Sequence, residues 1–326
     1  MSAPVLRIDD VLTTFPTAGT RIPVVDRVSL EVAAGEVLAL VGESGCGKSM
    51  TAFSAMRLVP KPGRVESGRI GLCGRDVLGL SVNEMRSVRG SDAAMIFQEP
   101  MTSLNPVQTA GAQVVEAIRL HERISFDAAR SRTLELFEQV QIPDPEQRFD
   151  AYPHQLSGGL KQRVMIAMAV SMRPKLLIAD EPTTALDVTI QAQIIELLRE
   201  LQRELGTAIL LITHDLGVVN ELADRIAVMY AGRIVEQGER VDVLSNGSHP
   251  YTQGLLRSIP AQSRRGRALS EIPGVVPSPR DWPAGCRFST RCDRVQERCH
   301  GEVPGSTTVA AGHTLHCFDV ADEVAR

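Results

Sequence analysis

Short apolar runs recur along the chain at the length of buried β-strands. They lie at Glu36–Val41, Leu176–Ala179, Leu210–Ile212 and around Ile226. These runs are almost continuously apolar instead of alternating with polar residues, which is typical of strands in a parallel sheet covered on both faces. The pattern therefore predicts an α/β protein built around such a sheet.

Other segments predict a second kind of strand. Val28, Leu30 and Val32 alternate with polar residues, which indicates a half-buried strand of an antiparallel sheet. Further strands are predicted over Arg69–Cys73 and Ala93–Phe97.

Helices are predicted between the strands. Met50–Leu58 lacks proline and glycine, Thr109–Gln141 carries helical apolar spacing, and Gly158–Met172 continues it. Val188–Leu205 predicts a long helix that ends at Gly206.

The turn between the first apolar run and the first helix carries chemistry. It reads Gly42-Glu43-Ser44-Gly45-Cys46-Gly47-Lys48-Ser49 and is followed by Met50. This is the G-x-x-x-x-G-K-[ST] spacing of a phosphate-binding loop, in which glycines let successive amides face a phosphate. Lys48 then reaches the β/γ oxygens, and the Ser49 hydroxyl is a ligand for Mg²⁺. We therefore predict that residues 42–50 bind a nucleoside triphosphate with its magnesium ion.

Further motifs follow in a fixed order. They are Gln98 after a predicted strand, Leu156-Ser157-Gly158-Gly159-Leu160-Lys161-Gln162-Arg163, the strand end Asp180-Glu181, Ala185-Leu186-Asp187, and the strand end Thr213-His214-Asp215. Together they resemble the Q-loop, LSGGQ signature, Walker B, D-loop and switch histidine of ABC ATPases. The resemblance covers roughly residues 5–260.

The resemblance implies a fold and a domain organisation. The expected fold is the P-loop ABC nucleotide-binding domain, a mixed core sheet with an antiparallel β subdomain and a helical subdomain. That domain is expected over residues 1–260, with the helical subdomain at about 99–172. A small irregular Cys-rich extension is expected over 261–326.

The resemblance also implies roles for single residues. Two such domains meet head to tail, and Ser157, Gly158 and Gly159 bind the γ-phosphate of the partner's ATP. Within the hydrolytic site the implied roles are Mg²⁺ binding by Ser49, Gln98 and Asp180, water activation by Glu181, and γ-phosphate sensing by His214.

The adenine platform is expected from an aromatic residue of an early loop. Phe15 lies in a stretch with Pro16 and Gly19 that resembles a loop. The resemblance implies that Phe15 stacks on adenine, and the alternative is that it packs in the sheet.

A narrower resemblance concerns residues 97–106, 179–193, 249–252 and 272–279, which are similar to the oligopeptide/dipeptide/nickel branch of ABC importers. It implies an ATPase that powers import of dipeptides or oligopeptides, with nickel or another small solute as the alternative. The sequence of residues 164–169 and 178–180 resembles that of the D-type subunit of this branch. The implied partners are an F-type paralogous ATPase, two transmembrane permease subunits and, indirectly, an extracytoplasmic solute-binding protein. Leu160 and Lys161 depart from the branch, which usually has Met and Arg there.

Composition limits the alternatives. The chain has 326 residues and a formal net charge of −4, which gives no electrostatic footprint for nucleic acid. No apolar run approaches the ~20 residues of a membrane helix, and the first ten residues lack the basic and apolar regions of a signal peptide. We expect a peripheral protein at the cytoplasmic face of the inner membrane.

The C-terminal segment concentrates cysteine. Cys286, Cys292, Cys299 and Cys317 are separated by five, six and seventeen residues. Disulfides are not expected in the cytosol, so a metal site is favoured. The spacing lacks the paired knuckles of zinc sites and accommodates a [4Fe–4S] cluster, which the resemblance to importer ATPases also implies. Zinc, with histidine ligands, and free buried thiols remain as alternatives.

Two other classes of ABC protein usually have features that differ from this sequence. A soluble ABC ATPase of DNA repair, chromosome dynamics or translation usually carries a coiled-coil insert, two fused nucleotide domains or a basic surface. A regulatory subunit without hydrolysis usually lacks the Walker B glutamate or the switch histidine, and this chain has Glu181 and His214.

Overall fold

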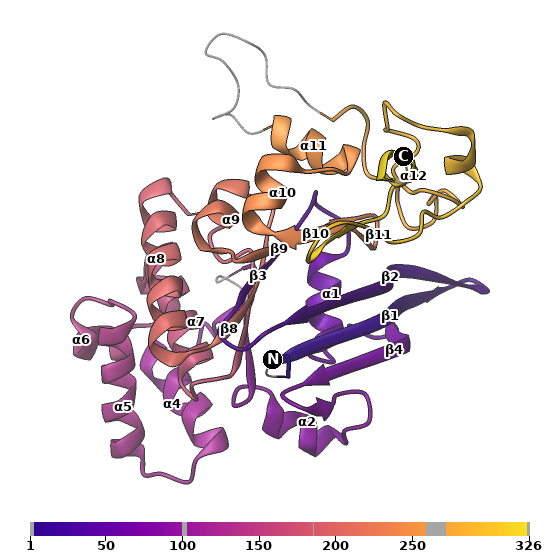
Figure 1. Cartoon of the computed structure of the whole chain (residues 1–326). Coiled ribbons are helices and arrows are strands. Elements are labelled where there is room, and N and C mark those ends of the chain that lie inside the picture. Colours follow the sequence, from indigo (N-terminus) through magenta and orange to yellow (C-terminus); the bar gives the residue numbers. More distant parts are fainter. Residues whose placement is uncertain (1–2, 100–102, 185, 259–271, 325–326) are drawn as a thin grey trace. The chain divides into compact units, whose positions relative to one another are not determined.

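The computed structural model describes residues 3–99, 103–184, 186–258 and 272–324 (Figure 1). By their internal contacts these residues form two compact units. The first unit comprises residues up to Leu6, Val32–Glu36 and Gly71–Leu211. The second comprises Arg7–Glu31, Val37–Ile70 and the chain from Ile212 onward.

The first unit is mainly helical. Its helices are α2 (Val82–Val88), α4 (Ala110–His121), α5 (Phe126–Gln139), α6 (Pro145–Phe149), the 3₁₀-helix η1 (Pro153–Gln155), α7 (Gly158–Val170) and α8 (Val188–Leu205). Its strands are β5 (Arg75–Asp76), β6 (Ala93–Ile96), β7 (Leu176–Asp180) and most of β8 (Ala208–Thr213). β6 and β7 pair in parallel, with Met95 opposite Ile178.

Helices α4, α5 and α7 pack against one another within the first unit (Figure 1). Each begins at a residue whose hydroxyl accepts a backbone N–H of the first turn: Thr109, Ser125 and Ser157. These caps satisfy amides that have no partner inside the helix. The shared interior includes Val114, Ile118 and other fully buried apolar side chains.

The second unit combines two sheets with surrounding helices. Its strands are β1 (Leu6–Thr17), β2 (Thr20–Val32), β3 (Val37–Val41), β4 (Arg64–Leu72), β9 (Arg225–Tyr230), β10 (Arg233–Glu239), β11 (Thr307–Ala310) and β12 (His313–Leu315). Its helices are α1 (Lys48–Ala55), α9 (Leu216–Leu222), α10 (Arg240–Asn246), α11 (Pro250–Arg257), the 3₁₀-helix η3 (Glu297–His300) and α12 (Phe318–Val324).

Strand order in the second unit is β2-β1-β4 in one sheet and β11-β12-β10-β9-β3 in the other. β3 runs parallel to β9, whereas β9, β10, β12 and β11 pair antiparallel in turn. All five residues of β3 are buried, as the apolar run predicts. The strand that leads into the phosphate loop is therefore held firmly inside the unit.

The C-terminal residues extend this sheet. β12 pairs with β10 so that Leu315 lies opposite Glu236. The Glu236 carboxylate is fully buried, accepts the amides of Ser248 and His249 at 2.8 and 3.0 Å, and lies 2.8 Å from Nε2 of His313. A buried carboxylate is tolerated only when it is hydrogen-bonded. This network therefore ties the C-terminal segment to the core of the second unit.

Most predicted elements are present, with shifted ends. The structure has β3, β6, β7, β8 and β9 where strands are predicted, and α8 has the predicted bounds. The segment Thr109–Gln141 is two helices, because Glu122–Ser125 leaves helical geometry between them. β4 begins at Arg64, five residues before the predicted strand. None of the helices in the described part of the chain has the length and apolarity to span a bilayer.

Candidate nucleotide site

The phosphate loop lies in the second unit between β3 and α1. Gly42, Gly45 and Gly47 have φ values of 154°, 78° and 109°. A Cβ on Gly42 would lie 2.2 Å from the Met229 carbonyl oxygen, and one on Gly47 would lie 2.7 Å from that of Val24. Two of the motif's glycines are thus required both by backbone conformation and by close packing.

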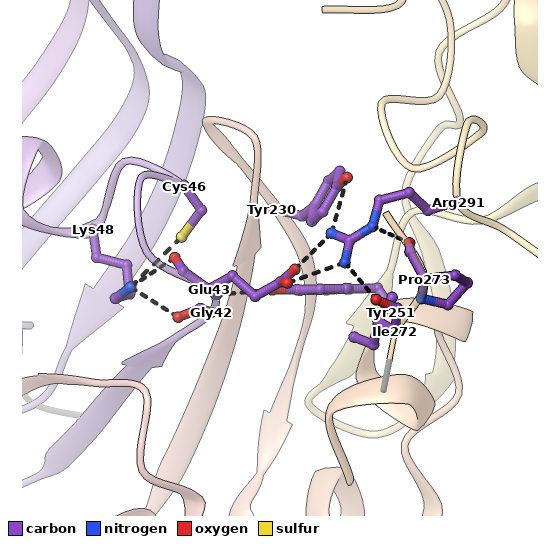
Figure 2. A network of polar contacts seen from close by, with 9 residues as sticks. All are labelled: Gly42, Glu43, Cys46, Lys48, Tyr230, Tyr251, Ile272, Pro273 and Arg291. Atoms are coloured by element: carbon purple, nitrogen blue, oxygen red, sulfur yellow. Dashed lines mark hydrogen bonds and ion pairs between the residues drawn. The ribbon is translucent and has the colours of Figure 1, made fainter. Parts of the chain in front are cut away.

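Lys48 is buried, and its ammonium is held by the loop itself (Figure 2). Nζ donates to the carbonyl oxygens of Gly42 at 2.8 Å and Glu43 at 3.0 Å. Cys46 is also buried, and burial raises the pKa of its thiol, with Lys48 opposing the shift. Cys46 therefore belongs to the interior of the loop as a neutral thiol.

The remaining loop residues surround this interior. Ser44 and Gly45 are exposed, whereas Ser49 and Met50 are half-buried in the first turn of α1. The amide-rich N-terminus of α1 follows directly, and such an end favours a bound anion. Binding of a triphosphate by residues 42–50 stays a prediction.

Two adjacent carboxylates, Asp180 and Glu181, lie in the first unit at the C-terminal end of β7. Glu181 has φ 48°, a left-handed conformation that is uncommon for a residue with a side chain. Its Oε2 accepts hydrogen bonds from Gln98 Nε2 at 3.0 Å and Thr184 Oγ1 at 2.8 Å. Asp180, the last residue of β7, is buried. The structure thus brings Gln98 and Glu181 together, and strain at Glu181 is the kind found at functional sites.

The signature residues form the N-terminal end of α7, also in the first unit. Ser157 caps the helix, and Ser157 and Gly158 are exposed. A Cβ on Gly159 would lie 2.8 Å from Ile190 Cγ2 at the start of α8, so close helix packing requires glycine there. Asp187 caps α8 by accepting the Ile190 amide at 2.9 Å. Ala185 of the predicted D-loop lies outside the described residues.

His214 follows β8 and is exposed. Its position is fixed by the next residue, because Asp215 caps α9 through the amides of Gly217 and Val218 and donates its own amide to Thr213 Oγ1. His214 belongs to the second unit, and its contact with a γ-phosphate stays a prediction.

The interpretation of Phe15 as a loop residue is wrong. Phe15 belongs to strand β1, is half-buried, and its ring lies over Gly63, where an added Cβ would be 2.6 Å from Cε1. Pro16 and Gly19 suggested a loop, but Pro16 lies near the end of this strand and Gly19 in the turn after it. Stacking on adenine stays a prediction.

Four thiols converge in the C-terminal segment. Cys286, Cys292, Cys299 and Cys317 line one cavity, which we call the thiol cavity. Burial raises the pKa of the Cys286 thiol to about 11 and also raises the pKa values of Cys292 and Cys317. Within the described residues, no three histidine, cysteine or acidic side chains form a group that could hold a metal ion.

Sequence comparison assigns the chain to a family. The ABC transporter family matches residues 25–184, and the family "Oligopeptide/dipeptide transporter, C-terminal region" matches residues 235–299. The dipeptide transport ATP-binding protein DppD of Escherichia coli K12 is 48% identical over 98% of both chains. The protein of the same name from Haemophilus influenzae is 52% identical over 92% of this chain and 91% of its own.

A solved structure supports the same assignment. The ATP-binding cassette MJ0796, described as a dimer in a post-hydrolysis state bound to ADP and Pi, has a TM-score of 0.66 and 27% identity. The match covers 72% of this chain and 98% of that one. The fold is that of an ABC nucleotide-binding domain, for which ATP with Mg²⁺ is the expected ligand and transmembrane permeases are the expected partners. The chain therefore belongs to the ATP-hydrolysing subunits of ABC transporters, in the branch of the oligopeptide and dipeptide importers.

Proposed function

We propose that this chain powers the import of dipeptides or oligopeptides across the bacterial cytoplasmic membrane, as a peripheral subunit on its cytoplasmic side. The observation that carries the proposal is the near-full-length identity with proteins named for dipeptide transport. That identity includes residues 235–299, which match the C-terminal region of oligopeptide/dipeptide transporters. It favours peptides over nickel as solute, and it favours transport over a soluble ATPase.

Within this function we propose a role for each site residue. Residues 42–50 hold the triphosphate, and Ser49, Asp180 and Gln98 supply the hydroxyl, carboxylate and amide oxygens that Mg²⁺ prefers. Glu181 takes the proton of the attacking water or orients that water. His214 contacts the γ-phosphate, and Phe15 stacks on adenine.

Transport can be tested in proteoliposomes that contain the complete importer and enclose ATP. A labelled dipeptide added outside with the solute-binding protein should accumulate in the lumen, on the side of the ATP. Lys48→Ala in this chain should reduce the rate by at least about tenfold, because the loop loses its only ammonium. If nickel accumulates and peptide does not, the proposed solute is wrong and nickel takes its place. If neither the solute nor the permeases change the rate of ATP hydrolysis, the result would favour a soluble ABC ATPase that is not coupled to transport.

We further propose that the working unit pairs this chain with an F-type paralogous ATPase. The exposed signature end of α7 carries Ser157 and Gly158 at a helix N-terminus, which suits a phosphate presented by another domain. The described dimer of the MJ0796 cassette supports pairing as the general arrangement. The extracytoplasmic solute-binding protein then acts through the permeases.

Pairing predicts a weak ATPase in isolation. We expect the specific activity of the purified chain to rise with its concentration, and to rise by about tenfold or more when the F-type subunit is added, since each site needs a second signature. Steady-state phosphate release over a concentration series measures both effects. Full activity that is independent of concentration, in a chain that sediments as a monomer, would contradict the pairing.

We also propose that the thiol cavity holds a [4Fe–4S] cluster, in a Cys-rich extension that follows the nucleotide-binding domain at about residue 261. The cavity's donor set is four thiols. Cys292 Sγ accepts the Arg294 amide at 3.3 Å and Cys299 Sγ accepts the Gln296 amide at 3.4 Å, contacts that suit cluster thiolates. Ser289 lines the same cavity, and its buried hydroxyl has no hydrogen-bond partner among the described residues.

The spacing of the thiols favours a cluster over zinc. Zinc sites usually draw on paired C-x₂₋₄-C knuckles, which these four cysteines lack. A cluster takes one thiolate on each of four irons and accepts looser spacing along the chain. When bound, the cluster would crosslink the segments that carry the four cysteines.

The cluster has a direct test. Protein purified without oxygen should contain about four irons and four sulfides per chain and show a brown absorption band. Cys317→Ser should lower the iron content and make residues 286–317 sensitive to protease, whereas Cys73→Ser, outside the cavity, should change neither. Stoichiometric zinc would replace the cluster with a zinc site. A metal-free, protease-resistant protein would contradict both.

A further inference from the structure

The C-terminal segment reaches the phosphate loop through one arginine (Figure 2). Arg291 donates from Nη1 to Glu43 Oε2 at 2.7 Å and from Nη2 to Glu43 Oε1 at 3.1 Å. Glu43 is the second residue of the loop motif, and the two residues are 248 positions apart in the chain. The paired geometry is the strong, directional form of an arginine–carboxylate contact.

Arg291 is itself held in place. Its side chain is only 3% exposed, and it donates from Nε to the Pro273 carbonyl at 2.8 Å and from Nη2 to the Ile272 carbonyl at 3.2 Å. Nη1 also lies 3.5 Å from the Tyr230 hydroxyl. All three guanidinium nitrogens of Arg291 thus have hydrogen-bond partners. These contacts hold the side chain in place, so a movement of the loop would break its contact with Glu43.

The backbone of Glu43 is held from the same side. Its amide donates to the hydroxyl of Tyr251 on α11 at 2.9 Å. Tyr251 and Tyr230 are fully buried and meet edge to face with ring centroids 4.6 Å apart, and Phe288 packs on Tyr230 at 5.2 Å. We call Tyr230, Tyr251 and Arg291 the bracket.

The bracket is connected through Glu43 to the ammonium of Lys48, the group expected to contact the phosphates. In Figure 2 the Glu43 side chain extends away from Lys48 and toward Arg291. The Glu43 carbonyl oxygen, on the other side, accepts from Lys48 Nζ at 3.0 Å. A displacement of Glu43 therefore displaces Lys48. In addition, loss of Arg291 would leave the half-buried Glu43 carboxylate without its charged partner, and an unpaired, partly buried charge disfavours the present loop conformation.

From these contacts we infer that Arg291 is a positioning residue for the phosphate loop, through which the C-terminal segment sets the affinity for ATP. Arg291 does not touch the reacting atoms. It holds the loop in its binding conformation and neutralises the one carboxylate in it. By thermodynamic reciprocity, ATP binding then stabilises the segment that carries Arg291. The inference needs ATP binding but neither peptide transport nor an iron–sulfur cluster.

Single and double substitutions test whether Arg291 sets the affinity for ATP. In the assembled transporter we expect Arg291→Gln to raise the KM for ATP by about tenfold to a hundredfold, because loop misplacement is costly, while kcat changes by less than about threefold. Glu43→Gln together with Arg291→Gln should recover most of the loss, since no unpaired carboxylate is then left in the loop. Arg280→Gln is the matched control, because it removes an exposed arginine of the same segment. An Arg291→Gln enzyme with wild-type KM would overturn the inference.

Hydrogen exchange keeps the inference testable if Arg291→Gln fails to fold. In the wild-type chain, ATP should slow exchange of amides in residues 272–291, and Arg291→Lys, which keeps the charge but loses the fork, should weaken this protection. Equal exchange with and without ATP in the wild type would overturn the coupling. If substitution of Arg291 lowers thermal stability without changing ATP affinity, Arg291 is only a structural residue. That result would also overturn the inference.

Discussion

Glu181→Gln should lower the rate of ATP hydrolysis by ~10²–10⁴ while leaving ATP affinity unchanged. The amide is isosteric with the carboxylate and can still accept from Gln98 and Thr184, which contact Oε2 now. What is lost is the carboxylate that we propose as the base for the attacking water. Turnover of the assembled transporter should therefore fall although the local structure and nucleotide binding persist.

The measurement compares phosphate release with equilibrium ATP binding in the same preparation. The F-type partner must carry the equivalent change in parallel, so that its site does not mask the loss. Glu135→Gln, an exposed carboxylate on α5, is the matched control and should behave as wild type. Near wild-type turnover with both sites changed would remove Glu181 from the proposed mechanism.

Gly42→Ala should destabilise the second unit by more than about 3 kcal/mol and abolish ATP binding. The added Cβ would lie 2.2 Å from the Met229 carbonyl oxygen, and neither backbone can yield easily. Gly45→Ala is the matched comparison, because Gly45 also has positive φ but no atom within 4 Å of the added Cβ. Its cost should be the conformational one alone, about 1–2 kcal/mol.

Urea unfolding of both variants gives the free energies, and nucleotide titration gives the affinities. We expect the steric contact to dominate the difference between the two costs, since both alanines would adopt positive φ. Equal destabilisation by the two substitutions would mean that the tight approach of β9 to the loop is not a constraint on this position.

The elements that carry the nucleotide chemistry were predictable because they are local. A buried strand, a glycine-rich turn and a helix follow one another within residues 37–55, and each leaves its own pattern in the sequence. α8 was predictable with its end, because Gly206 adopts φ 64° where a helix stops. Such features depend on neighbours a few residues away.

The features that the sequence did not reveal depend on distant contacts. Nothing near Arg291 indicates that its partner is Glu43, since charged residues in irregular segments are usually solvated. β12 is three residues long, and it is a strand because β10 offers it an edge. Phe15 was misplaced because its surroundings contain turn residues, while the pairing of β1 is decided by β2 and β4.

The four cysteines were predictable from the sequence only in part. Their concentration in the sequence predicted that they would act together, and they do line one cavity. The nature of what they bind depends on distances between sulfurs, which spacing along an irregular chain does not determine. Chemical analysis of the purified protein is therefore needed to choose among the alternatives.

The composition of the second unit has a consequence for synthesis on the ribosome. This unit draws on residues from Arg7 to the C-terminal segment, whereas the main part of the first unit, Gly71–Leu211, is contiguous. Chains emerge from the N-terminus at about 5–20 residues per second. Until residues 313–315 emerge, the edge of β10 has no β12 to cover it, and such open edges invite pairing with other chains. The nascent protein thus cannot complete the unit that holds its phosphate loop before β12 is synthesised, and chaperone protection in that interval would matter most for β10.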